Sequence, residues 1–490
     1  MLHKIWLGVI FPLLASLSNG LAPDHGHNLT AQAATELALL YAYPLLAFQL
    51  EYTTLASRIG VNHMGHARQL STPQNRATVK PNVDTVYSVA LFDLSAGDVL
   101  IDIPEVPADQ YALFSFHDLY GDNFALFGPE SFAAAGTFCL GYGKDSSNAS
   151  GGENASDSCK EHVQSPTTFG VFLIRWLVKS DNINAIHSLQ NATGVKTDSR
   201  ELDGDMRAAD ETLRLSSAAW NSSASSPAET AIKLLCQVEQ ENTPGKIAGN
   251  ASVQDALSTA GFCAHNLASS AAVDLNAANR TALAAANTAG QKSLEHQNNG
   301  WSTVKSNLTG TFGDDYGLRA QIASTGYLML QAPAAVYPSW TNNTVAPPMQ
   351  GEVLELGAGQ SYIYSFSGKP PLRELGFWSL TAYAEDGFLI ENLRNVYALG
   401  DRSNITYPSG AAVYGNASSA EDDGEFKLLI QPADVTPPTN WTGNWLPGPS
   451  GGGNMSVLLR FYEATEDLLE GNYQYPVVSK QEAIRAVSES

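Results

Sequence analysis

The residue in this chain best suited to proton transfer is His117. It ends a short apolar run, and the segment that follows it, DLYGDN (118–123), is densely polar. Imidazole titrates near neutral pH and a carboxylate beside it can orient it, so His117 is the candidate acid–base group and Asp118 a candidate orienting group. Tyr120 is a candidate hydrogen-bond donor to a substrate. A histidine and an aspartate at a strand end also commonly close a turn, and this structural alternative stays open.

A second polar group lies in PNVDTVYSVALFDL (81–94), a segment typical of a turn followed by a strand. It contains Asn82, Asp84 and Tyr87. Asparagine and aspartate in a turn often bond their own backbone, so an Asx-turn is one interpretation. The other is that Asp84 and Tyr87 share a catalytic pocket with His117 and that Asn82 binds the substrate, because consecutive strands often pair.

Arg175 stands inside the otherwise apolar run VFLIRWL (171–177). A buried guanidinium needs a carboxylate partner, or it binds an anionic ligand. We predict a structural salt bridge, with Asp84 and Asp93 as candidate partners. Binding of an anionic substrate by Arg175 is the alternative.

Standard catalytic and cofactor signatures are missing from the sequence. It has no G-x-S-x-G elbow, no H-E-x-x-H motif, no P-loop and no strand-borne G-x-G-x-x-G. An ordinary α/β-hydrolase and a zincin protease are therefore disfavoured, and we predict no cofactor. His63 and His66 have ligand-like spacing, but no third ligand stands at motif distance, so we predict no metal site.

The composition limits the classes of molecule that the protein is expected to bind. The chain has 490 residues, of which 44% are hydrophobic and only 16% charged, and its formal net charge is −22. Nucleic acids and anionic membranes need clustered Lys and Arg, so neither is expected. We expect a small-molecule substrate or ligand, and a homo-oligomer is left open.

The N-terminus indicates export. A positively charged start is followed by the apolar stretch Ile5–Leu17 and by small residues, which together are typical of a signal peptide over residues 1–22. No later apolar run is long enough to cross a bilayer, so we predict no membrane span. The expected location is secreted and extracellular.

Many sequons support this location, because N-linked glycans are added to exported proteins. The predicted glycosylation sites are Asn28, Asn148, Asn154, Asn191, Asn221, Asn250, Asn279, Asn307, Asn342, Asn404, Asn416, Asn440 and Asn454.

Four cysteines in an oxidising compartment predict two disulfides, with three connectivities open. Proximity in the sequence favours Cys139–Cys159 and Cys236–Cys263.

Periodicity predicts an α+β protein with two β-rich parts, the C-terminal one sandwich-like or jelly-roll-like, and a helical middle segment. Thr30–Leu55 is a helical pattern that Pro44 should kink or split. The predicted domains are the signal peptide at 1–22, an N-terminal β-rich domain with a leading helix at 23–197, the helical segment at 198–335 and the C-terminal domain at 336–490.

Several motifs carry a family resemblance. Residues 81–94 and VPADQYALFSFHDLYGDNFALFG (106–128) resemble a domain of unknown function numbered 1254. Residues 377–403, 423–432 and 444–462 are similar to its usual C-terminal partner, number 1214. The resemblance implies a β-rich protein in two parts with a helical element between them. It identifies no catalytic residues.

Members of this family occur in bacteria and fungi, and some fungal ones are found beside secondary-metabolite enzymes. The resemblance therefore implies a role in secondary metabolism. We expect a secreted enzyme that acts on a small apolar molecule by acid–base chemistry, through hydrolysis, elimination or isomerisation. The alternative is a non-catalytic secreted binding or surface protein whose polar motifs are structural.

Overall fold

The computed structural model describes residues 29–486, except 77, 96, 130–134, 144–158, 180–181, 200–225, 239–255, 257, 262–272, 342–352 and 416–423. The predicted signal peptide lies outside these residues. So do Cys263 and the sequons at Asn28, Asn148, Asn154, Asn221, Asn250, Asn342 and Asn416.

The N-terminal part is a sandwich of two sheets. The first sheet has the order β1 (Met64–His66), β2 (Thr85–Asp93), β8 (Phe169–Leu177), β4 (Ala112–Asp118) and β5 (Asn123–Phe127). The second has the order β7 (Cys159–Ser165), β6 (Gly136–Tyr142), β3 (Gly97–Ile103) and β9 (Gly194–Ser199), and α2 (Ile183–Ala192) precedes β9. Alternate residues of each central strand point between the sheets, so Phe114, Phe172 and Trp176 pack there against Ile101 and Phe138.

A layer of helices covers the other face of the first sheet. It consists of α1 (Ala31–Ile59), α3 (Pro227–Val238), α6 (Leu275–Lys292) and α7 (Tyr316–Gly326), and α1 contacts each of the other three. Leu39 and Leu45 of α1 belong to the same core as Leu91 and Val171 of the sheet. The predicted split at Pro44 is wrong, because α1 continues through this residue as one helix, and the predicted kink stays a prediction.

Among the described residues, α1 alone has the length and composition of a membrane-spanning helix, and 56% of its most apolar window is buried inside the protein. Burial against α3, α6 and α7 is what a core helix of a globular fold requires.

The C-terminal part is a second sandwich, built mostly of antiparallel strands. One sheet contains β12 (Ala335–Val336), β20 (Gly453–Ala464), β16 (Leu372–Ala384) and β17 (Ala398–Gly400), with β14 (Val353–Leu356) also paired to β20. The other contains β19 (Trp445–Gly448), β18 (Phe426–Pro432), β15 (Gln360–Phe366) and β21 (Val477–Glu482). Phe366, Trp378, Phe426 and Phe461 fill the space between them. The predicted α+β arrangement, with a helical segment between two β-rich parts, is confirmed.

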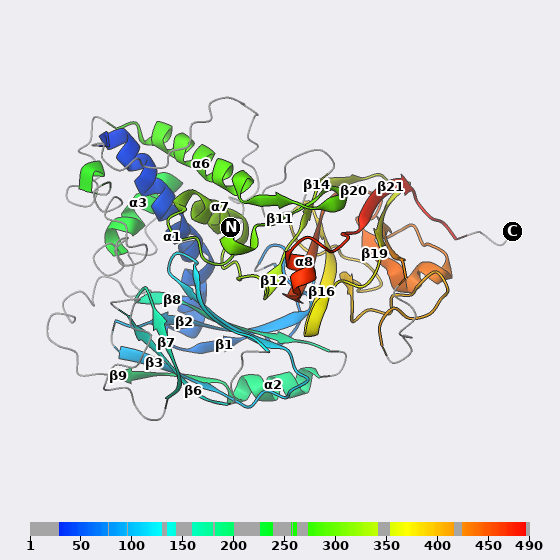
Figure 1. The fold of residues 1–490 in the computed structure, drawn as a ribbon, viewed down its shortest axis with the longest axis horizontal. Helices are drawn as coiled ribbons and strands as arrows, with labels where there is room; N and C mark the ends of the chain where they lie inside the picture. The colour runs from blue at the N-terminus through cyan, green and yellow to red at the C-terminus, as the bar shows by residue number, and fades with distance from the viewer. Residues whose placement is uncertain are drawn as a thin grey trace.

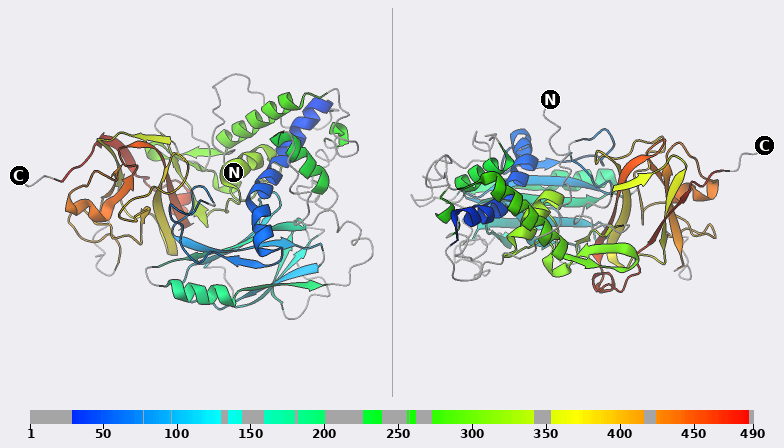
Figure 2. Two further views of the ribbon diagram at one scale, coloured as in Figure 1. Left: turned by 180° about the vertical axis from the view of Figure 1, so that it is seen from behind. Right: turned by 90° about the horizontal axis from the view of Figure 1, so that it is seen from above.

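Short elements connect the helical layer to the second sandwich. They are β10 (Leu294–His296), η2 (Asn298–Gly300), β11 (Trp301–Val304), η3 (Ser306–Leu308) and β13 (Ser339–Trp340). Within the second sandwich, η4 (Thr439–Asn444) lies between β18 and β19, and α8 (Glu466–Leu469) lies between β20 and β21. In Figure 1 the N-terminal sandwich lies below the helices, and β12, α8 and β16 stand where both meet the second sandwich. The two further views in Figure 2 keep the C-terminal sandwich at one end of the molecule. We call this meeting place the junction.

The disulfide Cys139–Cys159 is present, as predicted. Cys236 is also disulfide-bonded. Of the described sequons, the asparagine residues that are exposed are Asn191, Asn307, Asn404, Asn440 and Asn454, whereas Asn279 is partly buried.

Candidate functional site

The turn before β2 reaches across the junction to the C-terminal half. Asn82 Oδ1 accepts hydrogen bonds from the backbone N–H groups of Asp84 (2.6 Å) and Thr85 (3.2 Å), which forms an Asx-turn. Asn82 Nδ2 donates to the Tyr462 hydroxyl at 2.7 Å. Asp84 accepts from Ser379 Oγ at 2.6 Å. The polar residues of this turn therefore fasten the two halves together.

Asp84 belongs to a buried ion cluster with Arg402 and Asp401. The Arg402 guanidinium donates to both carboxylates, at 2.7 Å to Asp401. Asp401 also accepts from the Trp378 backbone N–H at 2.9 Å. Burial raises the pKa of Asp401, and the neighbouring Arg402 opposes that shift. Every carboxylate here has a cation, so the cluster is a structural clamp.

Arg175 has no such partner, and the predicted salt bridge from Arg175 to Asp84 or Asp93 is wrong. Its side chain projects from the middle of β8, opposite Tyr87 of β2, and Arg175 is 9% exposed. Within the described part of the chain it forms no ion pair, and its Nε and Nη1 atoms are buried without an acceptor. The guanidinium carbon lies 5.6 Å from the centre of the Tyr87 ring.

Four phenols surround Arg175, and we call them the tyrosine cluster: Tyr87, Tyr111, Tyr337 and Tyr462. Burial lowers the pKa of Arg175, but these phenols outweigh that effect and raise it above its ordinary value. The guanidinium is therefore always charged.

Packing between aromatic rings holds the side chains of the tyrosine cluster in position. Tyr462 stacks on Phe377 with ring centres 4.2 Å apart, and Tyr111 meets the same ring edge-on at 4.9 Å. The hydroxyls of Tyr337 and Tyr462 are 3.2 Å apart. Burial raises the pKa of both Tyr111 and Tyr462, so these phenols keep their protons at neutral pH. The Tyr111 hydroxyl has no partner among the described residues, which leaves it as an available donor.

A second buried guanidinium adds positive charge to the junction. Arg460, which is 5% exposed, donates to the Lys80 carbonyl at 3.0 Å and to Thr381 Oγ1 at 3.3 Å. It forms no ion pair within the described ranges, and its guanidinium faces the rings of Tyr337 and Tyr383. Burial and this arginine together lower the pKa of Lys80 to about 8. A cationic interior in a chain with a net charge of −22 favours an anionic ligand.

His117 lies on the same face of the sheet as Arg175, four residue pairs farther along β4 and β8. It is completely buried, and neither ring nitrogen has a hydrogen bond of normal geometry. Burial and the charge of Arg175 lower its pKa to about 3, although the nearby Gly121 backbone opposes this shift. His117 is thus a neutral imidazole and a weak base, and the predicted acid–base role finds no support in this geometry.

Asp118 and Tyr120 belong to the boundary with the helices. Asp118 Oδ1 accepts from the backbone N–H groups of Tyr120 and Asp122, both at 2.9 Å, so it organises its own loop. Burial and the like charge of Asp122 raise the pKa of Asp118 to about 8, and Arg319 of α7 opposes this shift. Tyr120 packs on Tyr41 of α1, with ring centres 4.8 Å apart.

Arg319 pairs with Asp122 through Nη2 at 2.7 Å and Nε at 3.3 Å. The sequence-predicted residues therefore divide between two places. Asn82, Asp84, Tyr87 and Arg175 gather at the junction, whereas Asp118 and Tyr120 face the helices. Among the described residues, His117 forms no hydrogen bond with Asp84.

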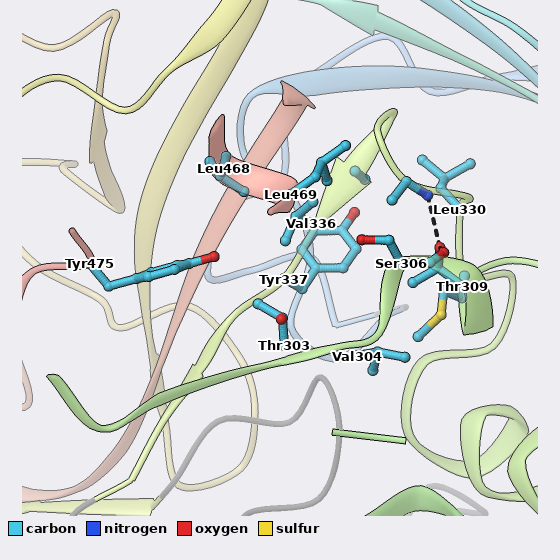
Figure 3. Close-up of a pocket in the computed structure, with 13 residues that line it drawn as sticks. Thr303, Val304, Ser306, Thr309, Leu330, Val336, Tyr337, Leu468, Leu469 and Tyr475 are labelled. Carbon is cyan, nitrogen blue, oxygen red and sulfur yellow. Dashed lines mark hydrogen bonds between the residues drawn. The ribbon is translucent and has the colours of Figure 1, made fainter. Parts of the chain in front are cut away.

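A surface hollow adjoins the junction (Figure 3). It is small and partly open to solvent. Its wall is formed by Thr303, Val304, Ser306, Thr309, Met329, Leu330, Ala332, Ala335, Val336, Tyr337, Leu468, Leu469 and Tyr475. Tyr337 therefore belongs both to this wall and to the tyrosine cluster.

Sequence reasoning did not assign roles to Tyr111, Tyr337, Tyr462 or Arg460. A signal was present for one of them, because Arg460 stands inside the apolar run VLLRFY just as Arg175 stands inside VFLIRWL. A single arginine in a strand that is otherwise apolar marks a buried charge whose partner should be sought.

The fold defines a class of protein with two β-sandwiches, a helical layer and a buried arginine–tyrosine site between them. Family models for proteins of unknown function match twice: DUF1254 over residues 61–197 and DUF1214 over residues 350–466. The chain therefore belongs to the family that combines these two domains.

A solved structure agrees with this fold. The crystal structure of the VPA0106 protein from Vibrio parahaemolyticus has a TM-score of 0.62 and 16% identity, and the match covers 92% of this chain and 100% of that one. A putative uncharacterized protein from Burkholderia cenocepacia matches with a TM-score of 0.42 and 10% identity, over 90% of this chain and 87% of the other. No curated protein sequence matches the chain.

Proposed function

We propose that this protein binds a small molecule through an anionic oxygen group, with Arg175 as the anchor. One observation carries the proposal: a guanidinium that is nine-tenths buried, with two nitrogens that lack an acceptor in the described part of the chain. Removing a charge from water is costly unless a partner replaces the water. Arg175 forms no ion pair with any described residue, and the groups that act most on its pKa are phenols, so a ligand oxygen is the partner that fits best.

We further propose that the bound molecule is transformed by acid–base chemistry without a nucleotide cofactor. A fixed guanidinium and buried phenol donors stabilise negative charge that develops on an oxygen, as in an isomerisation, elimination or hydrolysis. Tyr111 is a better hydrogen-bond donor for such a step than His117, because its hydroxyl keeps its proton and is unpartnered among the described residues. A non-catalytic binding protein would use the same anchor without turnover.

Export remains part of this proposal. Five exposed sequon asparagines and the Cys139–Cys159 disulfide suit an oxidising, extracellular environment. Treatment of the secreted protein with an N-glycosidase should lower its apparent mass, and the same mass before and after treatment would contradict the glycoprotein assignment.

Calorimetric titration of the secreted protein with carboxylates and with their neutral amides tests the anchor. We expect the carboxylates to bind and the amides to bind at least tenfold more weakly, since charged hydrogen bonds are the stronger ones. Arg175→Met should abolish the preference, while Arg280→Met, at an exposed position on α6, should preserve it. Equal binding of acid and amide by the wild-type protein would overturn the proposal.

Turnover separates the enzyme from the binding protein. Comparative metabolite profiling of a deletion strain of the producing organism should reveal a compound that accumulates, and the purified protein should consume it. If the compound binds but is recovered unchanged, the protein is a carrier or binding protein.

A further inference from the structure

We propose that Glu463 is the catalytic base of the Arg175 site, and that the ligand is a short carboxylate with an activated C–H bond on the carbon beside its carboxyl group. Glu463 removes that proton while Arg175 holds the carboxylate. This inference rests on the proposed function and adds a residue and a substrate class to it.

Glu463 is a buried carboxylate of β20, only 5% exposed, that the strand turns toward the N-terminal half. Phe461 belongs to the core of the C-terminal sandwich and Tyr462 to the apolar cluster at the junction, so regular alternation would return Glu463 to the core. Glu463 instead has a φ of 55°, which is uncommon for a residue other than glycine, and Ala464 takes the place in the core. Tyr462 and Glu463 therefore both face the junction.

The backbone around Glu463 holds this left-handed conformation. The Glu463 N–H donates to the Ala334 carbonyl at 3.3 Å, and the Ala464 N–H donates to the Pro333 carbonyl at 3.0 Å. The pairing of β20 with β16 shifts its register beside the same residue, and such irregularities re-aim a side chain. Residues held in uncommon backbone conformations are concentrated at functional sites.

Gly128 and Leu113 mark where the Glu463 carboxylate lies. Its Oε1 atom is 3.2 Å from the position that a Cβ atom on Gly128 would occupy, and Leu113 Cδ1 is 3.3 Å from that position. Leu113 pairs directly with Arg175 across β4 and β8, so the carboxylate and the guanidinium lie over the same face of the sheet. Gly128 follows β5, two strands from Arg175, which puts their backbones about 10 Å apart. A ligand that touches both side chains must therefore be small.

Tyr111 is a phenol on which both charged groups act. Its side chain is completely buried, and its hydroxyl has no partner among the described residues. Burial raises the pKa of Tyr111, the negative charge of Glu463 raises it further, and the positive charge of Arg175 opposes this shift. Tyr111 is thus a protonated donor beside both groups.

The proposed step is a proton transfer from carbon to oxygen. The C–H bond beside the carboxyl group breaks, the proton passes to an oxygen of Glu463, and the electron pair moves into the bond to the carboxyl carbon. Arg175 and Tyr111 stabilise the negative charge that develops on the ligand oxygens. Because a carboxylate is a weak base, the C–H bond must be activated by a neighbouring unsaturated group. Return of the proton to another carbon completes an isomerisation, and no oxidant or reductant is needed.

Exchange of hydrogen for deuterium tests the role of Glu463. The secreted protein is incubated in heavy water with vinylacetate or phenylacetate, NMR follows exchange at the carbon beside the carboxyl group, and calorimetry measures binding. Glu463→Gln keeps the size of the side chain, so it should bind both acids as the wild-type protein does and slow the exchange about a hundredfold. Glu355→Gln, at an exposed position on β14, is the matched control and should preserve the exchange rate.

Gly128→Ala is a second variant that leaves the carboxylate in the protein. Its methyl group would lie 3.2 Å from Glu463 Oε1, which displaces the carboxylate slightly and should slow the exchange about tenfold. Thermal unfolding of each variant shows whether it is folded, and Gly128→Ala decides the matter if Glu463→Gln does not fold.

The outcomes separate this inference from the proposed function. If the wild-type protein binds both acids without exchange, or if Glu463→Gln exchanges them at the wild-type rate, this inference is wrong and the anchor at Arg175 stands. If Arg175→Met binds the acids as the wild-type protein does, the proposed function itself falls.

Discussion

Two arginines of the junction, Arg402 and Arg175, differ in what surrounds them. Arg402 lies between the carboxylates of Asp84 and Asp401, and all three groups are hydrogen-bonded. Arg175 is buried more deeply, yet it forms no ion pair in the described part of the chain, and four phenols lie around it. A buried charge with protein partners stabilises a fold, and one without them destabilises it unless a ligand completes it. The comparison identifies Arg402 as structural and Arg175 as functional.

The largest expected effect is at the paired arginine. Arg402→Met leaves Asp84 and Asp401 without their cation, and breaking a buried pair in this way costs about 3–5 kcal/mol. Chemical denaturation of the secreted protein measures this loss. Arg373→Met is the matched control, because Arg373 faces the exposed Glu466 at 3.8 Å and should cost less than about 1 kcal/mol. Similar losses for both variants would contradict the clamp.

The neighbours His117 and Asp118 have pKa values shifted in opposite directions, so each should make the stability of the protein depend on pH. The folded-state pKa of His117 is lowered to about 3, so stability that is present above its ordinary pKa near 6.5 is lost as the pH falls toward 3. The folded-state pKa of Asp118 is raised to about 8, so stability that is present below its ordinary pKa near 4 is lost as the pH rises toward 8. Between about pH 4 and 6.5 the two contributions oppose each other.

Single variants should separate these contributions. In the wild-type protein, His117 should make the free energy of unfolding rise with pH by up to about 1.4 kcal/mol per pH unit between pH 4 and 6.5. The His117→Gln variant should lack this rise. Asp118 should make the free energy of unfolding fall as the pH rises from 4 to 8, and the Asp118→Asn variant should lack this fall. Denaturation curves at each pH measure both. If the free energy of unfolding depends on pH in the same way in the wild-type protein and in both variants, the two groups are not buried as described.

The next effect has the opposite sign to that at Arg402. Arg175→Met replaces an uncompensated buried charge by an apolar side chain of similar length, so the free energy of unfolding should stay unchanged or rise by about 1–2 kcal/mol in the absence of ligand. The same denaturation experiment measures it. A loss of 3 kcal/mol or more would indicate that Arg175 has a structural partner after all.

The smallest effect concerns the phenol pair. Tyr337→Phe removes the contact between the hydroxyls of Tyr337 and Tyr462, which should cost about 0.5–1.5 kcal/mol. A double-variant cycle with Tyr462→Phe isolates the pairwise part. Additive losses would mean that the two hydroxyls do not interact.

Strand and helix patterns in the sequence predicted most of the fold, because alternating and 3.6-residue periodicities report local burial. Pro44 shows a limit: packing of α1 against three helices outweighs the local preference of one proline. The Asx-turn at Asn82 was also foreseen, since it is a local contact.

The site was predicted less well, because its contacts join distant parts of the chain. Asp84 and Arg402 are 318 positions apart, and Asn82 and Tyr462 are 380 apart, so no spacing rule links them. Arg175 was recognised as a buried charge from its apolar neighbours. Its lack of a carboxylate partner could be known only once the sheets were placed against each other.

A crystal structure of the secreted protein grown with octanoate would test the central claim most directly. Our account predicts a carboxylate within about 3 Å of a nitrogen of Arg175. A protein carboxylate bound to the Arg175 guanidinium, with octanoate absent or bound elsewhere, would contradict it.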